Sequence, residues 1–263
     1  MTEFFRAHKY IVSLGACVII ILLFVFREDI SRFLVVKERP GESVIFPGGQ
    51  GKSENMSSPD VIPPYTGRDP AEFRPDPKET ASFSKEDLDS ISSQIQTNAR
   101  GVREHSDFLE GWLQIGLLKK VIGDFEGARD AWEYAGVIRP LNSVSFANLG
   151  ELYWRYLPDY RKAEKNFRVS VTNKPDDPAV YISFSDLYYY SYTEKKHLAD
   201  NILIEGIQKN PGNVDLMKWL AALYERDKNY SLALEWWKKV LEKSPSDAAV
   251  RETIADLETK LGK

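Results

Sequence analysis

A unit of about 35 residues repeats along the carboxy-terminal half of this chain. Each copy ends in a proline, at Pro140, Pro175, Pro211 and Pro245, and successive prolines lie 35, 36 and 34 residues apart. Self-similarity at this period is typical of solenoids built from stacked helical hairpins, because a single hairpin cannot bury its apolar face alone. The repeat therefore predicts an all-α fold for this region, built from consecutive helix pairs.

The aligned units share one apolar pattern, which is distributed over two helices. Small residues on one helix let its neighbour approach closely, and bulky residues fill the space beside them. The large and small residues of the first helices are Trp112 and Gly116, Phe146 and Gly150, Tyr181 and Ser185, and Met217 and Ala221. The small and bulky residues of the second helices are Ala128 and Trp132, Ala163 and Phe167, Ala199 and Leu203, and Ala233 and Trp237.

This pattern resembles the tetratricopeptide repeat family over residues 109–245. Four units match in phase, and they cover residues 109–142, 143–177, 178–213 and 214–245. The resemblance implies a right-handed solenoid of helical hairpins. The second and third units carry extra residues, and both insertions fall in expected turns, where additional length is tolerated.

Helices are also expected on either side of the four units. Ser84 and Asp87 have the spacing of a capping box, which predicts a capping helix or degenerate half-repeat over residues 84–108. After the last proline, the apolar stripe of Val250, Ile254 and Leu257 predicts a second capping helix over residues 246–263. Such end helices shield the stack from solvent.

An uncharged apolar run occupies residues 10–26. As a helix, these 17 residues would span about 26 Å, close to the roughly 30 Å of a bilayer's hydrocarbon core. We therefore expect a single-pass transmembrane helix in the lipid bilayer, preceded by a short tail over residues 1–9.

Two other interpretations of this run stay open. A cleaved signal peptide needs a small-residue cleavage site, and none follows the run. A lipoprotein signal would use Cys17, although the most apolar part of the run lies after this cysteine.

The orientation of the anchor is a separate question. Counting Lys and Arg slightly favours repeats in the cytoplasm, but long domains translocate largely regardless of charge. We expect a signal-anchor that places the repeats on the extracytoplasmic side.

Residues 27–83 are rich in proline and glycine and show no apolar period. This composition predicts a linker between the membrane and the repeats. Residues 49–53 resemble the end of a phosphate-binding loop, but Phe46 stands where that loop needs its first glycine. We therefore expect no nucleotide site in the linker.

The rest of the sequence offers no recognisable catalytic site. The net charge of −4 argues against nucleic acid as a primary partner, because contacts to phosphate need clustered Lys and Arg. Cys17 is the one cysteine, so no intrachain disulfide can form. His8, His105 and His197 are isolated in the sequence, and no nucleophile–base motif is present. The sequence predicts a chain that is not an enzyme and that uses no cofactor and no metal.

In the tetratricopeptide repeat family, the first helix of each unit lines the concave face. The resemblance therefore implies that partner-binding residues lie on these helices. Aromatic side chains would hold apolar groups of a peptide, while Asn148 and Arg155 would bind its backbone or a carboxylate. Trp154 and Tyr189 are equally compatible with packing on a neighbouring helix. The expected partner-binding residues are Asn148, Glu151, Trp154, Arg155, Asp186, Tyr189, Tyr190, Trp219 and Arg226.

These features predict a membrane-anchored adaptor or scaffold that binds a protein or peptide in its concave groove. The architecture resembles one-pass tetratricopeptide proteins that accompany bacterial secretion, envelope-assembly or pilus machinery. The alternative is a self-associating scaffold or spacer, a homo-oligomer whose groove is filled by another copy or by its own linker. Residues 63–75 are the candidate for such a ligand, because prolines reduce the entropy lost on docking. An enzyme is a third interpretation, which no motif supports.

Overall fold

The computed structural model describes residues 62–262. The expected tail over residues 1–9, the transmembrane helix over 10–26 and the linker as far as residue 61 lie outside the described residues. Residues 62–262 contain α-helices, one π-helix and one 3₁₀-helix, and no strand occurs among them. Among these helices, none combines the length and the apolar composition that a bilayer crossing requires.

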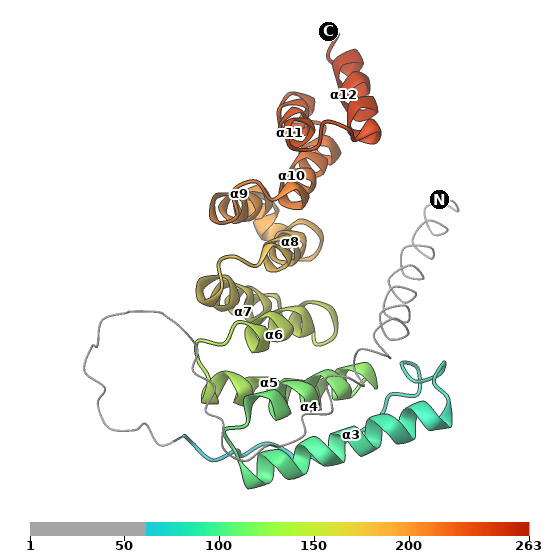
Figure 1. Cartoon of the computed structure of the whole chain (residues 1–263), viewed down its shortest axis with the longest axis vertical. Coiled ribbons are helices and arrows are strands. Elements are labelled where there is room, and N and C mark those ends of the chain that lie inside the picture. The colour runs from blue at the N-terminus through green and yellow to red at the C-terminus, as the bar shows by residue number, and fades with distance from the viewer. Residues whose placement is uncertain (1–61, 263) are drawn as a thin grey trace, which may run out of the picture. The chain divides into compact units, whose positions relative to one another are not determined.

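The helices form consecutive antiparallel pairs that stack from α3 to α12 (Figure 1). The expected all-α solenoid of helical hairpins is confirmed for this part of the chain. The α-helices are α3 Lys85–Glu104, α4 Leu109–Val121, α5 Phe125–Ile138, α6 Val144–Arg155, α7 Tyr160–Asn173, α8 Pro178–Asp186, α9 Ala199–Lys209, α10 Val214–Arg226, α11 Tyr230–Lys243 and α12 Ala248–Lys260.

The paired small and bulky residues hold each hairpin together. A Cβ atom on Gly116 would overlap the indole of Trp132, and one on Gly150 would lie 2.6 Å from Cδ1 of Phe167. Both bulky side chains are fully buried. Trp132 also donates its indole N–H to the carbonyl of Leu113, at 3.2 Å. The repeated small residue on the first helix therefore exists to admit the bulky residue of the second.

Short polar side chains start most of the helices. Ser84 and Asp87 form the expected capping box, in which each side chain accepts a hydrogen bond from the other residue's backbone N–H. Asp124 and Asp159 cap the second helices α5 and α7 by accepting a backbone N–H three residues later. Asp247 caps α12 in the same way. These caps satisfy N–H groups that have no partner inside the helix.

The third unit departs from the regular hairpin. Helix α8 ends at Asp186, and the chain continues as a π-helix over Leu187–Ser191 and a 3₁₀-helix over Thr193–Leu198. The extra residues of this unit are thus absorbed partly within the first helix and partly in the turn after it. A π-helix widens the turn and shifts the side chains that follow, and such segments often occur at functional sites.

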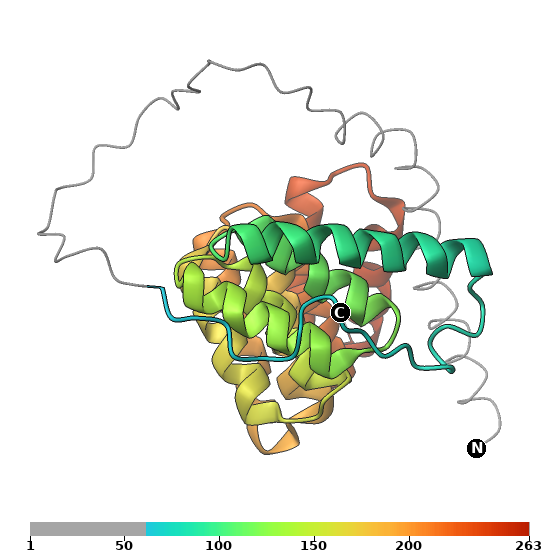
Figure 2. The same cartoon turned by 90° about the horizontal axis from the view of Figure 1, so that it is seen from below.

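The last part of the expected linker packs against the repeats. We call residues 62–76 the strap; it runs in extended form beside α3, α4 and α5 (cyan in Figure 2). Tyr65 joins the core cluster around Trp112, and Phe73 and Phe83 pack against a second cluster around Ile95. Residues 62–83 are therefore not a free linker in this structure, because their aromatic side chains pack on the repeats. These aromatic residues follow no helical or strand period, so the apolar pattern of the sequence did not reveal them.

The strap lies away from the face on which the groove was expected. It covers Trp112 and Ile122 of the first unit, whereas Leu117 and Val121 of α4 remain exposed. The described part of the linker therefore does not fill the concave groove in this structure.

Candidate partner-binding surface

The nine expected partner-binding residues come from the first helices of three successive units. Helix α6 carries four of them, the α8 segment and its π-helix carry three, and α10 carries two. Two hydrogen bonds, Trp219 to Asp186 and Arg226 to Tyr190, together with the charge of Arg155 near Asp186, group five of them into what we call the concave cluster. Its members are Arg155, Asp186, Tyr190, Trp219 and Arg226.

Asp186 stands at the centre of the concave cluster. Its Oδ1 accepts the indole N–H of Trp219 at 3.2 Å. Burial raises the pKa of the Asp186 carboxyl, and the Trp219 hydrogen bond and the charges of Arg226 and Arg155 only partly oppose this. Within residues 62–262, no cation lies within ion-pair distance of this carboxylate. Asp186 is thus a half-buried carboxylate that accepts a hydrogen bond from Trp219 and can accept further hydrogen bonds.

Two aromatic rings beside Asp186 are open to solvent. Tyr190 is 54% exposed and Trp219 is 37% exposed. The Tyr190 hydroxyl accepts a hydrogen bond from Nη1 of Arg226, which bridges the π-helix to α10. Exposed aromatic rings beside an arginine are the residue types that dominate protein interfaces.

The π-helix also orients Tyr189, which the sequence left between partner contact and packing. Its hydroxyl donates to Oδ1 of Asp227 at 2.8 Å, and its ring lies 4.3 Å from Nζ of Lys196. Lys196 in turn pairs with Asp227 at 3.0 Å. Tyr189 is therefore bound to residues of its own chain at the end of α10. Its ring also packs edge to face against the ring of Tyr190.

Trp154 lies under the surface and presents little of its ring. It is 8% exposed, and its indole N–H donates to Oγ of Ser191 in the π-helix at 2.8 Å. The guanidinium of Arg155 stacks over the indole, 3.7 Å from its centre. Trp154 thus positions Arg155 and the π-helix. A partner bound over Trp154 would contact the guanidinium of Arg155 and not the indole itself.

The amino-terminal part of the same face has a different character. Glu151 accepts a hydrogen bond from Nζ of Lys120 at 3.0 Å and lies 3.9 Å from Nε of Arg155, so its charge is shared between two cations. Asn148 is half-buried. Val121 and Val144 are exposed here and were absent from the expected set. Val121 lies four residues after Leu117, and Val144 lies four residues before Asn148. This helical spacing could have predicted that they share a face with those residues.

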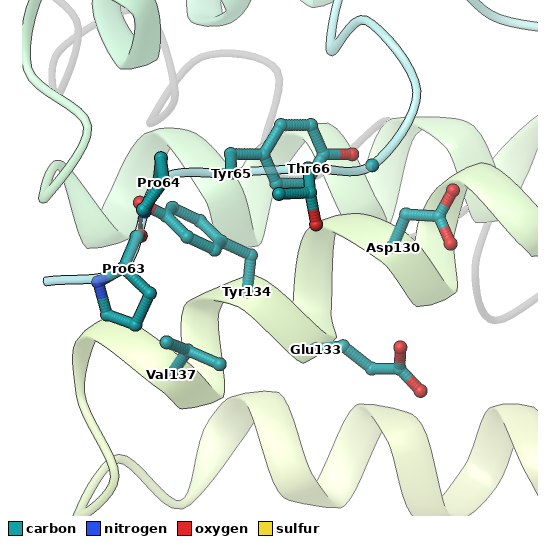
Figure 3. A pocket seen from close by; sticks show the side chains of 9 residues that line it. Pro63, Pro64, Tyr65, Thr66, Asp130, Glu133, Tyr134 and Val137 are labelled. Carbon is teal, nitrogen blue, oxygen red and sulfur yellow. Dashed lines mark hydrogen bonds between the residues drawn. The ribbon is translucent and has the colours of Figure 1, made fainter.

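Two hollows lie elsewhere, one beside each end of the strap. One, of about 320 Å³, lies between strap residues 63–67 and helix α5, where Asp130, Glu133, Tyr134 and Val137 line it (Figure 3). The other, of about 400 Å³, lies between the strap's carboxy-terminal part and the turn at Gly123. Neither includes a residue of the concave cluster. Within residues 62–262, no group of three potential metal ligands occurs.

Comparisons with known proteins agree with this architecture. No protein-family model matches the chain. Over 95 residues the chain is 33% identical to tetratricopeptide repeat protein 8 of Mus musculus, a match that covers 36% of this chain and 18% of that relative. The crystal structure of MamA is similar with a TM-score of 0.50 and 17% identity, covering 65% of this chain and 96% of MamA. At this identity the likeness shows the fold alone, which is a solenoid of stacked helical hairpins.

Proposed function

We propose that this tetratricopeptide-repeat chain is a non-catalytic scaffold that binds a segment of a partner protein on the concave surface of α6, α8 and α10. The concave cluster carries this proposal. It combines two exposed aromatic rings, two arginines and an under-satisfied carboxylate within three adjacent units. The hydrogen bonds within the cluster link α8 and its π-helix to α10, and they leave both aromatic rings open to solvent.

The cluster suits an extended or helical peptide laid across the first helices. Burial of Tyr190 and Trp219 supplies apolar area, and truncation of such rings at interfaces commonly costs about 2 kcal/mol or more of binding free energy. Asp186 would accept a backbone N–H or another donor from the partner, and the free N–H groups of Arg155 and Arg226 would donate to carbonyl or carboxylate oxygens. Aromatic anchors and polar orientation together define a groove-type recognition mode.

The same proposal places the scaffold on a membrane. The uncharged run over residues 10–26 supports a single-pass signal-anchor, with the repeats on the extracytoplasmic side and a role in secretion or envelope-complex assembly. Alkaline phosphatase fused after residue 263 tests the orientation, because this enzyme needs disulfides that form outside the cytoplasm. An active fusion supports the proposed side, and an inactive but expressed fusion contradicts it.

Site-specific photo-crosslinking in native membranes tests the binding surface. The probe replaces Tyr190, and a matched probe replaces Lys165, which is exposed on the second helix α7. A discrete adduct from the Tyr190 probe alone supports the scaffold, and its mass indicates the partner. Adducts only with another copy of this chain would favour the self-associating alternative, and equal labelling at both positions would contradict a concave site.

A further inference from the structure

The strap runs beside α3, α4 and α5 (Figure 2), and its apolar side chains pack on residues of these helices; we call the place that it fills the channel, with α3 and α5 as its walls and α4 as its floor. On one wall, Asp69 pairs with Arg103, and the carbonyl of Ala71 accepts a hydrogen bond from Gln96. On the other wall, strap residues near position 63 contact the carboxy-terminal half of α5, and those near position 76 reach the turn before it. The strap thus runs antiparallel to both walls.

Tyr65 is the apolar anchor of the strap. Its ring centre lies 4.5 Å from that of Trp112 and 5.1 Å from that of Tyr134. The Tyr134 hydroxyl donates to the carbonyl oxygen of Pro63 at 3.0 Å, which fixes the strap just before the ring. Burial raises the pKa of Tyr65 to about 12, with the nearby charge of Asp130 adding to the effect. The rings of Trp112 and Tyr134 thus form a pocket that accepts one aromatic side chain, here that of Tyr65.

Arg68 is the charged anchor, three residues after Tyr65. Its Nη2 lies 2.9 Å from Oδ1 of Asp124, and its Nε lies 3.4 Å from Oδ2 of Asp130. The Asp124 side chain is 4% exposed, so the pair is well shielded from water. Lys119 is buried beneath, and its burial lowers the pKa of its ammonium. The channel therefore presents two carboxylates at the position of the ligand's cation.

The strap is held mainly by its side chains. It makes few backbone hydrogen bonds to the helices, among them Asp76 N–H to the carbonyl of Ile122 at 2.8 Å and Arg74 N–H to Oδ2 of Asp124 at 3.3 Å. A hollow also lies between each end of the strap and the α5 side of the channel, so this edge is not closely packed; Figure 3 shows the hollow beside residues 63–67. These features are those of a peptide bound to a receptor, whereas a core element would be closely packed.

We propose that the channel between α3 and α5 is a second peptide-binding site, separate from the concave surface. It takes in trans an extended segment of a partner protein that carries a proline pair, a tyrosine and an arginine three residues after the tyrosine. The strap, with Pro63, Pro64, Tyr65 and Arg68, is the resident ligand in cis. Prolines before the tyrosine reduce the entropy lost on docking, and the two channel carboxylates select a basic ligand.

Tethering makes the strap a strong competitor for this site. A short linkage to α3 gives it an effective concentration in the millimolar range, so a ligand in trans binds well only when the strap is weakened or displaced. Occupation of the channel in trans would free residues 62–76 from the repeats and leave the concave cluster untouched.

Peptide binding to the full chain, purified in detergent, tests the proposal. The probe is a fluorescein-labelled synthetic peptide of residues 59–77, and the matched control peptide carries Tyr65→Ala and Arg68→Ala. The full chain with the same two substitutions is expected to bind the probe at least about tenfold more tightly than the control peptide. The unaltered chain is expected to bind the probe about tenfold more weakly than this variant does, because its own strap occupies the channel.

Equal affinity for the two peptides, in a variant that keeps its helical circular dichroism, would overturn the proposal. Should the variant lose its helical signal, hydrogen exchange on the unaltered chain decides. The backbone amides of Arg74 and Asp76 are expected to exchange before those of α4 and α5, since the strap detaches as a unit. Exchange of both sets in one common opening would show that the strap is part of the fold. A Trp219→Ala substitution is expected to leave probe binding unchanged, which separates this site from the concave cluster.

Discussion

The strap channel and the concave cluster use the same four residue types in opposite ways. In the channel, Tyr65 packs on Trp112, and Arg68 is paired with the buried Asp124. In the concave cluster, Tyr190 binds Arg226, and Trp219 donates to Asp186, yet both rings stay open to solvent. Tyrosine, tryptophan, arginine and aspartate thus form an internal closure in one region and an unfilled surface in the other.

The difference shows why residue type alone does not separate a site that a segment of the same chain fills from a site that is open to a partner. The channel residues are matched by a segment of the same chain, and their burial contributes to the stability of the first unit. The concave residues are matched to one another only in part, so their remaining surface and hydrogen-bonding capacity are available to a partner. Substitutions in the channel should therefore change stability, and substitutions in the cluster should change binding.

The two tryptophans give the largest expected contrast. Trp112→Ala removes a fully buried ring from the channel and should lower the free energy of unfolding by about 3–5 kcal/mol. Trp219→Ala removes a partly exposed ring and should lower it by less than about 1 kcal/mol. Urea denaturation followed by circular dichroism measures both values. Similar losses of stability in the two variants would show that Trp219 supports the fold as much as Trp112 does.

The two arginines should show the same ordering with smaller effects. Arg68→Met removes the cation paired with the buried Asp124, which keeps the backbone N–H groups of Gly127 and Arg74 and the nearby Lys119, and should cost about 2 kcal/mol of stability. Arg226→Met removes an exposed contact to Tyr190 and should cost less than about 0.5 kcal/mol. Thermal unfolding of the two variants beside the unaltered chain tests this. A larger loss for Arg226→Met would mean that the concave cluster is structural.

The smallest effect concerns pH and Asp186. Because burial raises the pKa of this carboxyl, the folded state keeps its proton to a higher pH than the unfolded chain does. Stability should therefore fall as pH rises from the unfolded carboxyl pKa, about 4, through the folded pKa. Asp186→Asn removes this loss, so the variant should be slightly more stable at pH 7 and equal to the unaltered chain in acid.

Asp247→Asn is the matched control for this measurement. The hydrogen bond from Lys218 lowers the pKa of the Asp247 carboxyl, so its ionised form stabilises the fold. This control should be less stable than the unaltered chain at pH 7, and the difference should shrink as pH falls from the unfolded pKa toward the lowered folded pKa of Asp247. Denaturation midpoints between pH 3 and pH 8 check both signs, and a common sign for the two variants would contradict the assignment at Asp186.

The sequence predicted the hairpins well because their packing is local and periodic. Gly116 with Trp132, and Gly150 with Phe167, are close in the chain and recur in phase. The sequence suggested residues 63–75 as a ligand in cis, but it did not predict where they dock, for the opposite reason. Arg68 meets Asp124 across 56 residues, and the Pro63 carbonyl meets Tyr134 across 71, with no repeat to mark either pair.

The candidate site was predictable in its location and less so in its details. Register placed Asp186 and Trp219 on neighbouring first helices, and the structure joins them by a hydrogen bond. The π-helix over Leu187–Ser191 has no simple sequence signal, and it decides that Tyr190 is open while Tyr189 is engaged with Asp227. The sequence left Trp154 between partner contact and packing, and in the structure its indole N–H donates to Oγ of Ser191 in that same π-helix.

The most direct test of the concave site uses the cross-linked adduct formed by a probe at Tyr190 in native membranes. The adduct is quantified by mass spectrometry in chains that also carry Trp219→Ala or, as a matched control, Leu141→Ala, an exposed apolar residue outside the concave cluster. The account predicts that Trp219→Ala reduces the adduct at least about tenfold, while Leu141→Ala leaves it unchanged. An adduct that survives Trp219→Ala at full yield, or that Leu141→Ala reduces equally, would contradict a partner-binding site at the concave cluster.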